Sequence, residues 1–253
     1  MLKTQYDRRG HTDVVRVVEP AALVPIQMRI YEMTARLLVP HDADLPLGAR
    51  LALPLADTPR EQDWSALMAA VNESPELAAL VGAAPVRAAF ERLFEGTVEP
   101  FGISRFRAQL PRQGRSVYGW HQDEGTWYAV SAKNLAHKLP ATLWLSLNGA
   151  DASNSIEIVP GSHTGFLEDR YFTDGQGYFR AELPHALRQT TSFVVAAEAG
   201  EGVFFHPLAF HRSVPMQTDR PRYSIDIRYY PTAVEPRRYK VRLRFRAKRL
   251  VAR

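Results

Sequence analysis

The spacing of apolar residues changes near residue 100, from a helical period to the period of β-strands. Before that point, apolar side chains recur every three or four residues in three segments, which predicts helices. Pro85 lies inside the third segment and is expected to interrupt or restart that helix, because proline lacks a backbone N–H. The elements predicted here are a strand over 13–18, helices over 20–37, 64–71 and 77–94, and a loop over 40–60.

From Phe101 onward, short apolar runs and alternating segments are separated by Gly and Pro turns. Many short strands in this arrangement indicate a sandwich or barrel. Arg105, Arg107 and Gln109 occupy alternate positions, so a strand would place all three on one face. The predicted strands lie over 101–110 and around 143–147, 155–159, 193–196, 203–205 and 223–229.

Composition narrows the class of protein. The chain has 253 residues, of which 45% are hydrophobic, which is enough for a sizeable core. It has no Cys, so it holds no disulfide framework, thiolate metal site or cysteine nucleophile. No run approaches 18 apolar residues, and no apolar run follows the charges of residues 1–9, which argues against a membrane span and a signal peptide. We therefore expect a cytoplasmic protein.

The net charge of +5 is unevenly distributed. Residues 237–253 hold nine Lys and Arg and no acid, so the remaining 23 basic and 27 acidic residues give residues 1–236 a net charge of −4. A body without a basic face argues against nucleic-acid binding. Within the tail, 241–246 alternates strictly, which predicts a strand with three arginines on one face. It is either an edge strand or a face for an acidic partner or an anionic substrate.

Candidate chemistry lies in the β-rich part. His121 and Asp123 are two residues apart, so a strand would point both side chains to one face. His211 follows an apolar strand and completes two histidines and one carboxylate, the ligand set of a non-haem Fe(II) site with open positions. His206 is the competing distal ligand. Arg222 comes eleven positions after His211 and can bind a carboxylate in a bidentate fork.

Five segments carry a resemblance to a known family. They are WHQDEGTW at 120–127, LPATLWLSLN at 139–148, NSIEIVPGSHTG at 154–165, VFFHPLAFHRSVP at 203–215 and RPRYSIDIRYYP at 220–231. Together they resemble the phytanoyl-CoA dioxygenase family of Fe(II)/2-oxoglutarate-dependent oxygenases, which includes ectoine-hydroxylase-like members. The resemblance covers residues 100–231 and extends weakly to 10–39. Two positions depart from the family pattern: Ser155, where Gly usually follows Asn, and Glu157, where the strand is usually apolar.

The resemblance implies a mainly β fold with flanking helices, a cupin-like jelly-roll or double-stranded β-helix. We expect one domain over 1–253, with a helix-rich part at 1–98, the jelly-roll core at 99–231 and a basic strand or tail at 232–253. The implied cofactors are Fe(II), 2-oxoglutarate as co-substrate and O₂. The implied site residues are His121, Asp123 and His211 for the metal and catalysis, Arg222, Gln109, Ser213 and Ser224 for the co-substrate, and Trp127, Arg105 and Glu124 for the substrate.

The activity implied by the resemblance is hydroxylation of an unactivated C–H bond in a small metabolite or biosynthetic intermediate, with release of succinate and CO₂. Two other classes stay open: another jelly-roll metalloenzyme, such as a cupin-type isomerase or a zinc hydrolase, and a non-catalytic binding module. A metalloenzyme of another kind would leave Arg222 without a function, and a binding module would be expected to have lost a ligand. Trp127 serves either the pocket or core packing.

Overall fold

The computed structural model describes residues 1–57, 60–112, 117–123, 140–164, 171–173, 179–181 and 183–233. The predicted substrate residues Glu124 and Trp127 and the basic tail 237–253 lie outside the described residues. Among the helices that are described, none is long and apolar enough to cross a membrane.

Helices dominate the first hundred residues, as the helical spacing predicts. The predicted third helix is interrupted at Gly82 and Ala83, and Pro85 lies in the first turn of the helix that follows, as expected. Two helices were not predicted, one at the N-terminus and a short one inside the predicted loop 40–60. The helices are α1 (Leu2–Arg9), α2 (Val24–Thr34), α3 (Leu47–Leu51), α4 (Glu61–Asn72), α5 (Pro75–Val81) and α6 (Ala84–Phe94), with 3₁₀ turns at Pro20–Leu23, Ala35–Leu37, Ser162–Thr164 and His185–Leu187.

The strands confirm the predicted β-rich second part. The strand predicted over 13–18 shrinks to two residues, because only Val15 and Arg16 pair with a neighbouring strand. The strands are β1 (Val15–Arg16), β2 (Val98–Pro100), β3 (Arg105–Gln109), β4 (Ala141–Ser146), β5 (Ile156–Ile158), β6 (Tyr171–Thr173), β7 (Phe179–Ala181), β8 (Phe193–Val194), β9 (Glu201–Phe205), β10 (His211–Ser213) and β11 (Arg222–Pro231).

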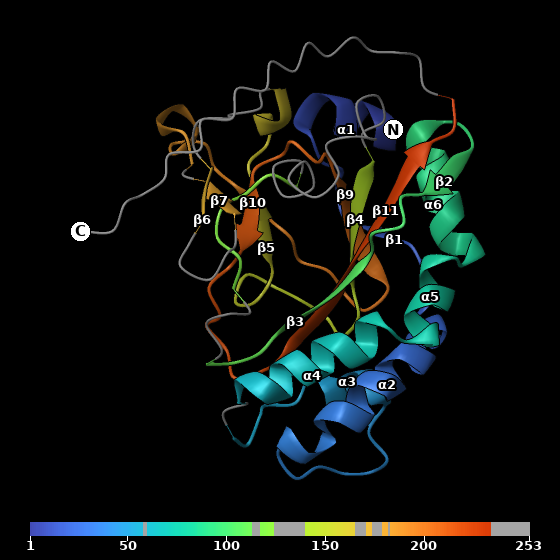
Figure 1. Ribbon diagram of the computed structural model, residues 1–253, viewed down its shortest axis with the longest axis vertical. Coiled ribbons are helices and arrows are strands. Elements are labelled where there is room, and N and C mark those ends of the chain that lie inside the picture. Colours follow the sequence, from blue (N-terminus) through green and yellow to red (C-terminus); the bar gives the residue numbers. More distant parts are fainter. Residues whose placement is uncertain are drawn as a thin grey trace.

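Two antiparallel sheets form the body of the fold. The larger sheet has the order β1-β9-β4-β11-β2, with β3 also paired to β11, and the smaller has the order β10-β5-β8. Figure 1 shows the smaller sheet on the left of the larger one, with α2, α3 and α4 at the bottom of the view and α5 and α6 on the right. β6 and β7 form a separate hairpin.

Strand β11 separates two cores because its side chains alternate between the two faces of the sheet. Its odd-numbered residues are apolar or aromatic and pack with the buried side chains of the helices: Tyr223, Ile225, Ile227 and Tyr229. On the opposite side, a second apolar cluster joins Trp144, Val203 and Phe205 of the larger sheet to Ile156 and Ile158 of β5. The even-numbered residues of β11 as far as Arg228 face this interior and are polar: Arg222, Ser224, Asp226 and Arg228. One strand therefore supplies both a helix-packing surface and a polar lining between the sheets.

Candidate active site

The structure brings together His121, Asp123 and His211, whose ligand atoms all lie within 4.8 Å of one another. Oδ1 of Asp123 is 3.9 Å from Nε2 of His121 and 3.7 Å from Nε2 of His211. The two imidazole centroids are 4.1 Å apart. Three donor atoms therefore converge on one point from three side chains that are buried or nearly so.

A reciprocal pair of backbone hydrogen bonds fixes the two histidines relative to each other. His121 and His211 form an isolated antiparallel bridge, in which each N–H donates to the other's carbonyl at 3.0 Å. His211 opens β10, but Asp123 lies outside the named strands. The prediction that one strand carries both His121 and Asp123 is therefore wrong. The bridge includes His121 but not Asp123, whose carboxylate nevertheless lies beside both imidazole rings.

Hydrogen bonds to the backbone set the tautomer of both histidines. Nδ1 of His121 lies 2.8 Å from the Gly119 carbonyl, and Nδ1 of His211 lies 3.0 Å from the Ala209 carbonyl. Because a carbonyl only accepts, each Nδ1 carries the proton and each Nε2 keeps its lone pair for a metal. Burial, and then the neighbouring His211, lowers the pKa of His121 to about 3, so this ring is neutral at pH 7.

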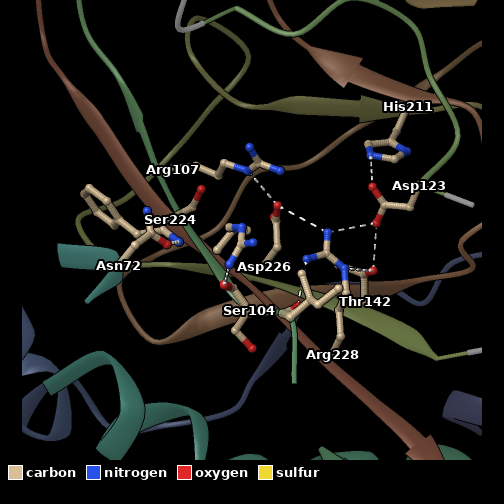
Figure 2. Close-up of polar contacts among 12 residues, drawn as sticks. Asn72, Ser104, Arg107, Asp123, Thr142, His211, Ser224, Asp226 and Arg228 are labelled. Atoms are coloured by element: carbon tan, nitrogen blue, oxygen red, sulfur yellow. Dashed lines mark hydrogen bonds and ion pairs between the residues drawn. The ribbon is translucent and has the colours of Figure 1, made fainter. Parts of the chain in front are cut away.

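The two oxygens of Asp123 have different surroundings. Oδ2 accepts hydrogen bonds from Thr142 Oγ1 at 2.9 Å and from Arg228 Nη2 at 3.1 Å, whereas Oδ1 faces His211 (Figure 2). Oδ1 is also the oxygen near Nε2 of His121. Burial alone would raise the pKa of Asp123, but the charge and hydrogen bond of Arg228, together with the neighbouring His211 and His121, outweigh burial and hold this pKa well below its usual range. Two imidazole nitrogens and one carboxylate oxygen, all turned to one point, fit a divalent metal ion.

Arg222 lies at the other end of the same face of β11, and its side chain is buried, with 2% of its surface exposed. Its guanidinium donates from Nε to the Asn154 carbonyl at 3.1 Å, from Nη1 to Ser224 Oγ at 2.7 Å and from Nη2 to Gln109 Oε1. Burial lowers its pKa to about 10, which leaves it charged at pH 7. No carboxylate of the described residues forms an ion pair with it. This is a buried cation whose known partners are all neutral.

The predicted shared face of β3 is confirmed by the strand register. Gln109 pairs with Arg222, Arg107 with Ser224, and Arg105 with Asp226. Arg107 donates from Nε to Asp226 at 2.8 Å, but the exposed Arg105 makes its one assigned hydrogen bond to the Ser104 carbonyl. The predicted co-substrate residues Gln109 and Ser224 thus meet at Arg222, and Arg105 lies at the exposed end of the stripe.

Other sequence candidates lie outside this group. Ser213 is buried at the end of β10, where its N–H donates to the Tyr118 carbonyl. His206, the competing distal ligand, lies 5.3 Å from the His163 ring and 5.6 Å from the Tyr6 ring, and is not among the three clustered metal-ligand candidates. Glu157, which departs from the family pattern, is explained by its partner, because it accepts from Arg212.

Sequence reasoning missed Thr142 and Arg228, which bind the Asp123 carboxylate, and Asp226, which contacts Arg228. Arg228 is 1% exposed and also contacts Asp226 at 3.5 Å. The alternation of β11 could have indicated Asp226 and Arg228, because they share a face with Arg222 while the opposite face is apolar or aromatic. Thr142 had no such signal.

Comparisons with known proteins show which family and which solved structures the chain resembles. The family model for phytanoyl-CoA dioxygenase matches residues 6–224, and curated protein sequences give no significant match. Three solved structures share the fold: the epimerase SnoN in complex with Fe³⁺, α-ketoglutarate and nogalamycin RO, the carbocyclase SnoK from nogalamycin biosynthesis, and the non-haem monooxygenase ThoJ. Their TM-scores are 0.59, 0.58 and 0.60, with 18%, 18% and 20% identity, over 93% of this chain and 84%, 85% and 79% of theirs.

These findings confirm the predicted jelly-roll class and the expected cofactors, iron with 2-oxoglutarate and O₂. The family match extends over most of the sequence, from α1 to the middle of β11. The chain belongs to the phytanoyl-CoA dioxygenase family, which indicates a non-haem enzyme that depends on iron and 2-oxoglutarate.

Proposed function

We propose that this protein is a dioxygenase that hydroxylates an unactivated C–H bond of a small metabolite or biosynthetic intermediate, with release of succinate and CO₂. The observation that carries the proposal is the convergence of the three donor atoms of His121, Asp123 and His211, together with the buried guanidinium of Arg222 on β11. These three residues are the metal ligands in this proposal. Their arrangement leaves metal positions open for a bidentate 2-oxo acid and for O₂.

Arg222 is the residue that binds the distal carboxylate of 2-oxoglutarate. A guanidinium has five N–H donors, and three of those of Arg222 are used by Asn154, Ser224 and Gln109. One N–H remains on each terminal nitrogen, which is what an end-on fork to a carboxylate needs. The neutral partners fix the orientation of the guanidinium without neutralising its charge. The incoming carboxylate then supplies the counter-charge that the buried cation lacks.

The part of the site near Arg105, which we propose to face the substrate, has more basic than acidic side chains. Arg105 and Arg107 stand across β11 from Asp226 and Ser224, and only Arg107 is paired with the carboxylate. Although Arg105 is exposed at the surface, its partial burial, followed by the charges of Arg107 and Arg228, lowers its pKa against the opposing effect of Asp226. Arg105 is therefore proposed to bind an acceptor or anionic group of the substrate. Glu124 and Trp127, which follow Asp123 in the sequence, are the other proposed substrate residues.

Iron, when bound with 2-oxoglutarate and O₂, supplies the oxidising power that removes hydrogen from a C–H bond. The protein's own residues decide where the substrate lies and which carbon is presented. The relatives include an epimerase and a carbocyclase as well as a monooxygenase. Epimerisation and ring closure also begin with removal of hydrogen from carbon, so they are the second candidate outcome at this site.

The proposal is tested by 2-oxoglutarate turnover without a known substrate. Wild-type protein with Fe(II) and O₂ is expected to form succinate slowly, and His121→Ala, Asp123→Ala and His211→Ala should each abolish it. His206→Ala is the matched control, because this histidine is nearby in sequence but not in the cluster. Succinate formation that survives in His211→Ala but disappears in His206→Ala would show that the ligand assignment is wrong.

A further inference from the structure

Asp123 is held by a closed ring of hydrogen bonds rather than by a single contact. Arg228 donates from Nη2 to Asp123 Oδ2 at 3.1 Å and from Nε to Thr142 Oγ1 at 3.2 Å. Thr142 Oγ1 in turn donates to the same Oδ2 at 2.9 Å. The ring joins β4, β11 and the segment after the histidine bridge, and it is completely buried, since Thr142 and Arg228 are 0% and 1% exposed.

The donor and the acceptor of each hydrogen bond in the ring are fixed by the chemistry of the three side chains. A hydroxyl has one proton, and a guanidinium can only donate. Because Thr142 Oγ1 accepts from Arg228 Nε, its own proton is free to go to Asp123, which as a carboxylate can only accept. Oδ2 therefore receives two hydrogen bonds, while Oδ1 faces the Nε2 atoms of the histidines.

Arg228 is itself held from its remaining sides. It donates from Nη1 to the Ile103 carbonyl at 3.1 Å, and its Nη2 lies 3.5 Å from Asp226 Oδ2. Asp226 is also bound by Arg107, so Arg107, Asp226, Arg228 and Asp123 form a chain of alternating charge (Figure 2). Rotation of Arg228 away from Asp123 would break several contacts at once, which makes the guanidinium a fixed support.

We propose that Thr142 and Arg228 are positioning residues that restrict Asp123 to metal binding through Oδ1 alone. Oδ2 has its lone pairs occupied by two donors and cannot also approach the ion. One carboxylate oxygen and two imidazoles leave three positions of a six-coordinate metal open, whereas a bidentate carboxylate would leave only two. Three are needed for a bidentate 2-oxo acid together with O₂. This inference rests on the proposed metal role of His121, Asp123 and His211.

The test counts the waters on the metal. Mn(II) is bound to wild type, Thr142→Val, Thr142→Ser and Arg228→Lys, and the relaxation of water protons is measured without substrate or O₂. Valine matches the shape of threonine but neither donates nor accepts. Loss of one of three open positions should lower the relaxation enhancement by about a third in Thr142→Val and Arg228→Lys. Serine keeps the hydroxyl, so Thr142→Ser should match wild type.

A second measurement separates positioning from a merely structural role. In Thr142→Val, Mn(II) affinity should be unchanged or higher, while 2-oxoglutarate affinity of the Mn(II) form falls about tenfold, because the co-substrate must displace the second oxygen. A parallel loss of both affinities, or wild-type relaxation in metal-bound Thr142→Val, would overturn the proposal. Failure of the metal assignment itself looks different, since His211→Ala would then bind Mn(II) as tightly as the wild type, or the wild type would not bind it.

Discussion

The two ends of the polar face of β11 hold two buried arginines with opposite surroundings. Arg228 is 1% exposed and bonded to the carboxylates of Asp123 and Asp226. Arg222 is 2% exposed, and its assigned partners are a carbonyl, a hydroxyl and an amide. The strand and its pleat are the same for both residues, so the difference lies in the partners that the neighbouring strands bring.

This difference separates a residue that completes the fold from one that awaits a ligand. A buried charge is costly unless it is paired, and Arg228 is paired within the protein. Arg222 is oriented by hydrogen bonds but lacks a counter-charge among the described residues, and burial lowers its pKa to about 10. We infer that the counter-charge of Arg222 is the co-substrate carboxylate.

The largest expected difference is in the stability of the metal-free protein. Arg228→Met leaves the buried carboxylate of Asp123 without its cation and Asp226 with Arg107 alone, and breaking a buried pair in this way costs about 3–5 kcal/mol. Arg222→Met leaves three neutral groups unsatisfied, at about 1–3 kcal/mol each, but it also removes a buried cation that has no ion-pair partner among the described residues. Because removing this cation relieves its desolvation cost, the loss should be smaller than that of Arg228→Met. Urea unfolding of both variants measures this. Equal losses would show that the two arginines play equivalent structural roles.

The second expected difference is in stabilisation by the co-substrate. With Mn(II) bound, 2-oxoglutarate at about 100 times its dissociation constant should raise the unfolding free energy of wild type by about 2.7 kcal/mol. Arg222→Met loses a charge-assisted contact of about 1.5–3 kcal/mol, so its affinity for 2-oxoglutarate should fall by about one to two orders of magnitude. Thermal shift and calorimetric titration report both quantities. Metal affinity should be unchanged, because Arg222 is not among the clustered ligands.

The smallest expected effect concerns the residues that orient Arg222. Ser224→Ala removes one neutral hydrogen bond to its guanidinium, so 2-oxoglutarate affinity should fall about two- to tenfold. Ser146→Ala is the matched control, since Ser146 is equally buried and lies opposite Ser224 on β4, but its hydroxyl accepts from Gly149. Calorimetric titration of both variants decides the point, and equal losses would contradict an orienting role for Ser224.

Much of this comparison could be predicted from local pattern. The alternation of β11 placed Arg222 at the start of a half-polar strand, and the alternation of 105–109 placed Arg105, Arg107 and Gln109 on one face. In any β-strand, alternate side chains point to the same face, so the sequence alone shows which residues of a strand share a face.

The parts that failed depend on distant segments. The spacing of His121 and Asp123 predicted that one strand carries both residues. In the structure, His121 forms only an isolated bridge with His211, which is far away in the sequence, and Asp123 is not in a strand. Arg228 resembled any surface arginine until β4 brought Thr142 beside it and the bridge brought Asp123. Spacing within a segment cannot show which distant groups will meet a side chain.

The central claim is that the histidine–aspartate cluster and Arg222 together bind iron and 2-oxoglutarate. Its most direct test is an anaerobic titration of the Fe(II)-loaded protein with 2-oxoglutarate, followed by visible absorption. Wild-type protein should develop a weak metal-to-ligand band that saturates, His211→Ala should develop none, and Arg222→Met should need about ten to a hundred times more 2-oxoglutarate. No band in the wild type, or an identical titration in Arg222→Met, would contradict the account.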